Sequence, residues 1–186
     1  MPVIAQTPRA RLRTWRHGDQ AKLARYCNTE QVMEHLGGVQ PMRSLREDVR
    51  WFRQCWSDNG HGYWVVERRS DDAFLGFCGL DLLKHDVPQA LTGEVEIGWR
   101  LREDAWGQGY ATEAASVVLD LAFRIHNMDR VVSRTDVANG ASIRVMRKLG
   151  MHRWPERESE TDEHVYLIER AGWLGNVMDN ALMGGQ

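Results

Sequence analysis

Cysteine is scarce in this sequence, and the spacing of the few present speaks against two common kinds of site. Cys27, Cys55 and Cys78 are the three cysteines among 186 residues, with no CxxC pair and no paired histidine cluster. An odd number of widely spaced cysteines predicts neither a disulfide framework nor a zinc site, so we assign no metal ligand. A reducing, cytoplasmic compartment fits such a chain best.

The chain also lacks a long apolar run and a strong charge of either sign. Charged residues occur from Arg9 onward, and no segment approaches the roughly 20 apolar residues that a membrane-spanning helix needs. A formal net charge of -2 and a pI near 6.4 give no field that would hold nucleic acid or an anionic membrane by charge alone. We therefore expect a soluble, unsecreted protein with neither of these partners.

The length of the chain suits one compact domain with a sizeable core. We place this domain at residues 1–172. The remaining tail, residues 173–186, has weak periodicity and ends near Gly184 and Gly185, so we expect it to be partly mobile.

Hydrophobic periodicity predicts an alternation of strands and helices. Ser44 and Glu47 have the spacing of a capping box, and Leu45, Val49, Phe52 and Trp56 follow as one apolar helical stripe. The expected helices cover residues 19–26, 30–36, 44 onward, 110–126 and 142–149, and the expected strands cover 9–15, 62–69, 74–83, 93–101, 130–135, 152–156 and 164–170. This order predicts an α/β (α+β) fold with a mixed, mostly antiparallel central sheet and helices on both faces.

The most informative segment is a glycine-containing turn between a strand and a long helix. The strand EVEIGWRL is followed by WGQGYATEA, and Gly107 and Gly109 allow positive φ and a close approach of the backbone to a ligand. Such a turn presents backbone N–H groups at the positive end of a helix dipole, which suits a pyrophosphate. Tight packing at a helix start remains an equal alternative for this segment alone. The dinucleotide fingerprint is incomplete and the Walker lysine is missing, which disfavours a nucleotide-binding oxidoreductase.

Two blocks of sequence resemble the GNAT (GCN5-related N-acetyltransferase) superfamily. EIGWRL with WGQGYATEA is similar to its acetyl-coenzyme A signature, and NGASIRVMRKLGM from Asn139 is similar to its second cofactor segment. The family pattern Q/R-x-x-G-x-G/A is matched by Gly109 and Ala111, while Trp106 takes the first position, as is usual in the Rim-type branch that acetylates amino termini of ribosomal proteins. The resemblance extends over about residues 9–170.

The resemblance implies acetyl-coenzyme A as cosubstrate and assigns its contacts. Backbone of Trp99 and Leu101 would pair with the pantetheine arm like an added strand, and Asn139 and Ser142 match positions that contact the same arm. The pyrophosphate would be held by the amides of Gly107, Gln108, Gly109, Tyr110, Ala111 and Thr112.

Transfer to an amine needs a base, because amines are protonated at neutral pH. Alternation along the strand places Glu94, Glu96, Gly98 and Arg100 on one face, and two nearby carboxylates can raise each other's pKa. Glu96 is our first candidate base and Glu94 the second. Both glutamates are equally compatible with a solvated face or with pairing to Arg100. A backbone amide around residues 97–99 would stabilise the oxyanion.

The tyrosine that often protonates the leaving thiolate in this superfamily is replaced by Met146. Ser142 is a candidate acid, although it suits a cofactor contact or an early helix position as well. Cys78 has no evident activating partner, which disfavours a covalent intermediate.

The sequence thus predicts an N-acetyltransferase that moves acetyl from acetyl-coenzyme A to a primary amine by direct attack in a ternary complex. A noncatalytic acyl-coenzyme A sensor is the alternative. The acceptor is either a small molecule or a protein amino terminus, and a homodimer is compatible with the resemblance.

Overall fold

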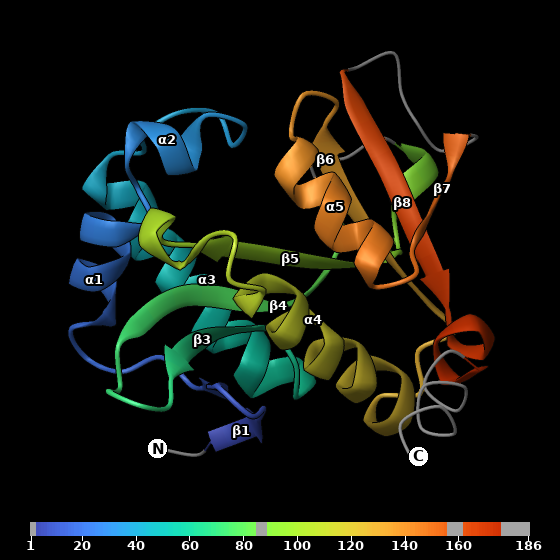
Figure 1. Cartoon of the computed structure of the whole chain (residues 1–186), viewed down its shortest axis with the longest axis horizontal. Coiled ribbons are helices and arrows are strands. Elements are labelled where there is room, and N and C mark those ends of the chain that lie inside the picture. Colours follow the sequence, from blue (N-terminus) through green and yellow to red (C-terminus); the bar gives the residue numbers. More distant parts are fainter. Residues whose placement is uncertain (1–2, 85–88, 156–161, 176–186) are drawn as a thin grey trace. The chain divides into compact units, whose positions relative to one another are not determined.

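The computed structural model describes residues 3–84, 89–155 and 162–175 (Figure 1). The expected turn before the last strand lies mostly outside these ranges, and so does the tail from residue 176 onward. The tail's expected mobility is therefore a prediction about residues that lie largely beyond the described part.

The strands form one mixed sheet in the order β1-β2-β3-β4-β5-β6-β8-β7. β5 and β6 pair in parallel, with Glu96 opposite Val132, whereas the pairs β1–β2, β2–β3, β3–β4, β6–β8 and β7–β8 are antiparallel. The predicted mixed, mostly antiparallel sheet is confirmed. The strand bounds are β1 Val3–Gln6, β2 Ala10–Arg13, β3 Tyr63–Arg68, β4 Phe74–Leu82, β5 Val95–Leu101, β6 Arg130–Asp136, β7 His152–Arg153 and β8 Glu163–Glu169.

In the described ranges, the α-helices that connect and cover these strands are α1 Asp19–Tyr26, α2 Glu30–Met33, α3 Met42–Asn59, α4 Tyr110–Asp120 and α5 Gly140–Lys148, and residues 170–175 are helical as well. α4 continues as a π-helical turn over Leu121–Ile125, and short 3-10 turns cover Gln89–Leu91 and Glu103–Ala105. α4 passes in front of strands β3 and β4 while α3 lies behind them (Figure 1).

Several local predictions differ from the structure. β1 was not predicted, because a strand of four residues is recognised only by its pairing with β2, where Val3 lies opposite Arg13. The capping box at Ser44 is wrong: α3 begins at Met42 after Pro41, no side chain caps it, and Glu47 pairs with Arg43 instead.

The apolar stripe of α3 is confirmed at three of its four positions. Leu45, Val49 and Phe52 are buried, but Cys55 takes the buried place expected for Trp56, which is only partly buried. The substitution follows from helix geometry, because positions 55 and 56 are both within one turn of Phe52.

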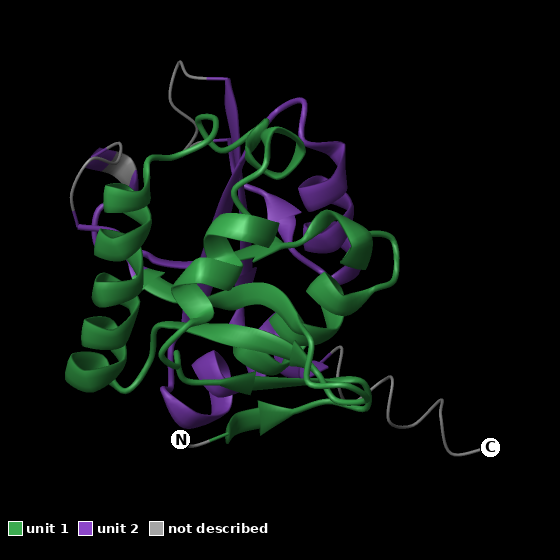
Figure 2. Ribbon diagram, turned by 90° about the vertical axis from the view of Figure 1, so that its left-hand side faces the viewer, with its two compact units in different colours: residues 1–81, 97–118 green, residues 82–96, 119–186 purple. Residues whose placement is uncertain are grey.

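The chain divides into two compact units that interleave along the sequence (Figure 2). The first unit contains residues 1–81 and 97–118, and the second contains residues 82–96 and 119–186. The boundaries fall inside β4, β5 and α4, so each of these elements contributes to both units. A single domain over residues 1–172 stays a prediction.

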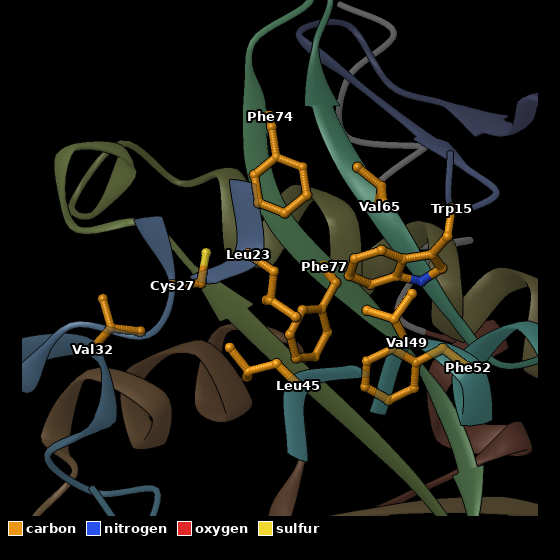
Figure 3. Close-up of a cluster of buried hydrophobic side chains, with 10 residues drawn as sticks. All are labelled: Trp15, Leu23, Cys27, Val32, Leu45, Val49, Phe52, Val65, Phe74 and Phe77. Carbon is orange, nitrogen blue, oxygen red and sulfur yellow. The ribbon is translucent and has the colours of Figure 1, made fainter. Parts of the chain in front are cut away.

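The core of the first unit is an aromatic cluster between α1, α3 and the strands β3 and β4 (Figure 3). The rings of Trp15 and Phe52 stack with centroids 5.5 Å apart, and those of Phe52 and Phe77 lie 5.2 Å apart. Ring pairs of this kind stabilise a core beyond the apolar area that they bury. The cluster contains Trp15, Leu23, Cys27, Val32, Leu45, Val49, Phe52, Val65, Phe74 and Phe77.

The first unit also contains a buried ion-pair network. The Arg13 side chain, with no exposed surface, donates to Glu67 at 2.7 Å and to Asp19 at 2.7 and 3.0 Å. Arg11 contacts the other Glu67 oxygen at 2.7 Å. This network joins β2, β3 and the start of α1.

The second unit has a smaller core, formed by Leu83, Leu91, Val132, Val165 and Leu167. Trp173, which the sequence places at the start of the tail, is 7% exposed. Its indole packs against Phe123 and donates to Asp120 at 2.9 Å. Residues 170–175 are helical and Trp173 is packed, so ordered structure extends beyond the expected boundary at residue 172.

Candidate functional site

The glycine turn lies in the first unit, directly before α4. Residues 106–109 are exposed, and Gly107 and Gly109 have φ values of +70° and +85°, which favour glycine. A Cβ at Gly107 would meet no atom within 4 Å. The turn is thus open on its outer side.

The backbone amides of this turn lack acceptors. In the described part of the chain, the first helical hydrogen bond of α4 runs from the Glu113 amide to the Gly109 carbonyl at 3.0 Å, and the amides of residues 107–112 donate to no protein group. Six successive donors at the positive end of an 11-residue helix form a site that suits an anion.

Arg9, near the start of the chain, contacts the glycine turn and the first turn of α4. Its guanidinium contacts Glu113 at 2.6 Å and the Gln108 carbonyl at 2.9 Å, and it lies 4.8 Å from the Tyr110 ring centroid. Its backbone amide also donates to Glu113 at 2.9 Å. Sequence reasoning missed this residue, because no local signal connects positions 104 residues apart.

The end of β5 leads into this turn. Trp99 is partly buried and Leu101 is buried. The Leu101 carbonyl accepts a hydrogen bond from the Trp106 indole at 2.9 Å. The indole therefore uses one of the two lone pairs of this carbonyl.

Glu96 lies in the second unit, next to Arg134 of β6. Its carboxylate accepts hydrogen bonds from the Arg134 backbone amide and Nε, both at 3.1 Å, and from Nη2 at 3.4 Å. The side chain is 16% exposed. Burial raises the pKa of Glu96, whereas the charge and hydrogen bonds of Arg134 act to lower it. The result is a carboxylate held in one orientation with a raised pKa, which suits a base.

Glu94 has its own arginine on the same neighbouring strand. Its carboxylate accepts from Arg130 Nε at 2.9 Å and is 15% exposed. The alternative that the two glutamates pair with Arg100 is wrong, because the parallel pairing of β5 and β6 supplies a separate arginine to each. The raised pKa of Glu96 comes from burial and, to a smaller extent, from Glu163, rather than from Glu94 as expected.

The second predicted cofactor segment forms the start of α5. Asn139 caps this helix, and its side-chain oxygen accepts from the Ser142 amide at 3.1 Å. Met146, at the position where related enzymes have tyrosine, is 1% exposed. Cys78 is fully buried, and burial raises the pKa of its thiol, which makes it a poor nucleophile.

Two kinds of feature are absent from the ranges that the structure describes. No cluster of three or more His, Cys, Asp or Glu side chains is arranged to hold a metal ion. None of the helices in those ranges combines the length and apolar character needed to cross a membrane.

The chain belongs to the GNAT acetyltransferase family. The model of the acetyltransferase (GNAT) domain matches residues 9–152, which include the glycine turn, Glu96 and the start of α5. The fold and the predicted family agree, and the protein is an acetyltransferase.

The individual relatives come mainly from Bacillus. The uncharacterized protein YkkB of Bacillus subtilis (strain 168) is 36% identical over 78% of this chain and 83% of its own length. The uncharacterized N-acetyltransferase YnaD of the same strain is 29% identical over 90% of this chain and 97% of its own length.

Two solved structures are similar in fold. An acetyltransferase of Agrobacterium tumefaciens str. C58 has a TM-score of 0.80 and 25% identity, covering 91% of this chain and 95% of its own. RimL, a ribosomal L7/L12 alpha-N-protein acetyltransferase solved with coenzyme A, has a TM-score of 0.71 and 16% identity, covering 90% and 98%. At that identity, RimL supports the fold alone.

Proposed function

We propose that this acetyltransferase takes its acetyl group from acetyl-coenzyme A and transfers it to a primary amine by direct attack in a ternary complex. The observation that carries the proposal is the run of six amides at residues 107–112 before α4, which donate to no group in the described part of the chain. A diphosphate is an anion of the kind that such a helix start binds. RimL, with the same fold, was solved with coenzyme A, which supports the choice of ligand.

The predicted cofactor contacts follow from this proposal. The amides from Gly107 to Thr112 hold the pyrophosphate, and the backbone of Trp99 and Leu101 contacts the pantetheine arm. Asn139 and Ser142 contact the same arm. Arg9 positions the turn, because it joins the Gln108 carbonyl to Glu113 in the first turn of α4.

Glu96 is the proposed base. It accepts a proton from the acceptor ammonium, the neutral amine attacks the thioester carbonyl carbon, and the carbon–sulfur bond breaks to release the thiolate. Arg134 is a positioning residue, since its guanidinium and backbone amide fix the orientation of the Glu96 carboxylate. Glu94 is the second candidate.

As the carbon–sulfur bond breaks, the attacking nitrogen loses its second proton. The thiolate leaves either unprotonated, with that proton passing to solvent, or with a proton from Ser142, which takes up the proton of the nitrogen in exchange. No dedicated acid is required, because this thiolate is a fairly good leaving group. The oxyanion is stabilised by a backbone amide around residues 97–99.

The test is release of free coenzyme A thiol with a panel of amines: a polyamine, amino acids, an aminoglycoside and a peptide with a free amino terminus. We expect turnover with at least one class, and Glu96→Gln should lower kcat by about 100-fold or more while coenzyme A affinity is retained. Binding of coenzyme A without turnover on any amine would favour the alternative, a noncatalytic acyl-coenzyme A sensor.

The setting of the reaction is part of the same proposal. The acceptor is a small amine or a protein amino terminus, and the reaction takes place in the cytoplasm, which agrees with three buried, free cysteines. A homodimer is proposed from the family resemblance and is tested by light scattering at several concentrations.

A further inference from the structure

Arg100, on β5 in the first unit, is a partly buried cation that forms no ion pair with any described carboxylate. Its Nε and Nη1 atoms are buried and make no hydrogen bond to any described residue. The residue as a whole is only partly buried, so part of its surface contacts solvent. Burial lowers the pKa of Arg100, which expresses the same lack of compensation.

Other partly or fully buried arginines in the described ranges have carboxylate partners. Arg13 has Asp19 and Glu67, and Arg134 has Glu96. Arg102, two residues beyond Arg100, pairs with Asp104. An arginine left unpaired in this setting destabilises the fold, so its missing partner needs an explanation.

The surroundings of Arg100 are apolar on one side and weakly acidic on the other. The guanidinium lies 5.2 Å from the Phe77 ring centroid. Asp48 of α3 interacts with it electrostatically, but no ion pair links the two among the described residues, and burial raises the pKa of Asp48. Cys27 and Tyr63 are the other titratable groups that interact electrostatically with Arg100.

Beside Arg100, β5 has a glycine, and the Tyr63 side chain takes the space that a residue with a Cβ would need. Gly98, two residues earlier on the same face, has the Tyr63 hydroxyl 2.7 Å from the position of a Cβ. Any larger residue there would displace Tyr63. The guanidinium, the Phe77 ring and the Tyr63 hydroxyl therefore belong to one patch of β3, β4 and β5.

We propose that Arg100 binds an anionic group, a carboxylate or a phosphate, that the amine acceptor carries. This inference rests on the proposed function and narrows its substrate class to amines with a negative charge. A guanidinium offers planar donors that match carboxylate and phosphate oxygens. A full negative charge compensates a buried cation, whereas a water molecule leaves its charge uncompensated.

The experiment compares matched acceptors that differ in one charge. L-Amino acids are compared with their amides for the carboxylate, and phosphoethanolamine with ethanolamine for the phosphate. In at least one of these comparisons, Arg100→Gln should lower kcat/KM for the charged member by about 10- to 100-fold and for the neutral member by less than about threefold. Differences in amine basicity cancel, because each acceptor is compared between variant and wild type.

Two variants separate a ligand role from a structural one. Arg100→Lys keeps the charge without the planar donors and should give an intermediate loss. Arg102→Gln removes a neighbouring arginine that has its own carboxylate and should leave the charged-to-neutral ratio unchanged. Equal losses for both members of every pair in Arg100→Gln would overturn the inference.

A stability measurement gives a readout independent of catalysis. Without acceptor, Arg100→Met should have a Tm equal to or above that of the wild type, because it removes an uncompensated charge and keeps the apolar length. A Tm lower by several degrees would contradict the inference.

Failure of the inference and failure of the proposed function give different results. If Arg100→Gln lowers turnover equally for charged and neutral acceptors, the acetyltransferase reaction is retained as the proposed function and the role of Arg100 is rejected. Absence of coenzyme A binding and of turnover with every amine removes the proposed function itself. Calorimetry with N-acetyl amino acids and their amides measures charge selectivity without turnover, and a selectivity that Arg100→Gln leaves intact contradicts the inference.

Discussion

At the scale of single residues, two glycines and two arginines define the chemistry that we propose. Gly107 and Gly109 give the turn a backbone that few other residues adopt, and the arginines Arg9 and Arg134 hold its carbonyl and the candidate base. Three of these four residues belong to the first unit and Arg134 belongs to the second.

A carboxylate introduced into the turn should oppose the binding of a diphosphate. Gly109→Glu is expected to weaken coenzyme A binding by more than about 100-fold, because it places a negative charge and a Cβ where the ligand would lie. Isothermal calorimetry measures the affinity. Gly93→Glu is the matched control, since Gly93 has φ +91° and open space around it but lies far along the chain from the turn. Equal affinity in wild type and Gly109→Glu would remove the pyrophosphate assignment.

The pH dependence of turnover reports which glutamate is the base. Glu96 accepts a proton only when ionised, so kcat/KM falls as the pH drops through its pKa, and burial places that fall above the ordinary glutamate value of about 4.3. Arg134→Gln removes the charge that lowers the pKa of Glu96, so it should move the acid limb to higher pH.

The matched control for this pH profile is Arg130→Gln, which removes the partner of Glu94. It should leave the acid limb unchanged if Glu96 is the base. If Arg130→Gln moves the acid limb of the profile to another pH and Arg134→Gln leaves it unchanged, Glu94 is the base.

At the scale of elements, charged contacts between strands and a helix stabilise the fold, and the local sequence does not predict them. β2, β3 and the start of α1 meet around Arg13, whose side chain has no exposed surface. The side chains of Asp19 and Glu67 are also almost completely buried, at 1% and 2% exposure. Removing one member of such a network leaves a buried charge without compensation.

Glu67→Ala should therefore lower the free energy of unfolding by about 3–5 kcal/mol. Chemical denaturation monitored by circular dichroism measures the loss. Glu47→Ala is the control, because its partner Arg43 is 89% exposed and a surface pair of this kind contributes at most about 1 kcal/mol. Similar losses of unfolding free energy in the two variants would show that the buried network stabilises the fold no more than a surface ion pair does.

At the scale of the whole molecule, the chain consists of two interleaved units. The turn at residues 107–112 belongs to the first unit, and Asn139 with Ser142 belongs to the second. A ligand that binds the folded chain and not the unfolded one stabilises the folded chain according to its occupancy.

Coenzyme A should therefore raise the Tm. At about 100 times its dissociation constant, it adds about 2.7 kcal/mol, which corresponds to roughly 5–10 °C for a chain of this length. Differential scanning fluorimetry measures the change, with NAD as the control ligand that should have no effect. A rise with NAD and none with coenzyme A would favour a nucleotide-binding function instead.

The elements were predictable where their signals are local. α1 ends where its pattern predicts, and the glycine turn with the start of α4 follows from residues a few positions apart. Two predictions failed for different reasons. β1 depends on its pairing with β2, which the local sequence does not show, and α3 begins after Pro41 without a side-chain cap although Ser44 has the spacing of a capping box.

The sequence by itself determined the family, the order of the elements and the candidate turn, because motif spacing, hydrophobic period and glycine position are properties of neighbouring residues. Only the tertiary structure decided which charges meet. Arg9 reaches Glu113 across 104 positions, Arg13 reaches Glu67 across 54, and Arg134 reaches Glu96 across 38. Strand register and helix packing bring these side chains together, and the same packing leaves Nε and Nη1 of Arg100 without a hydrogen-bond partner among the described residues.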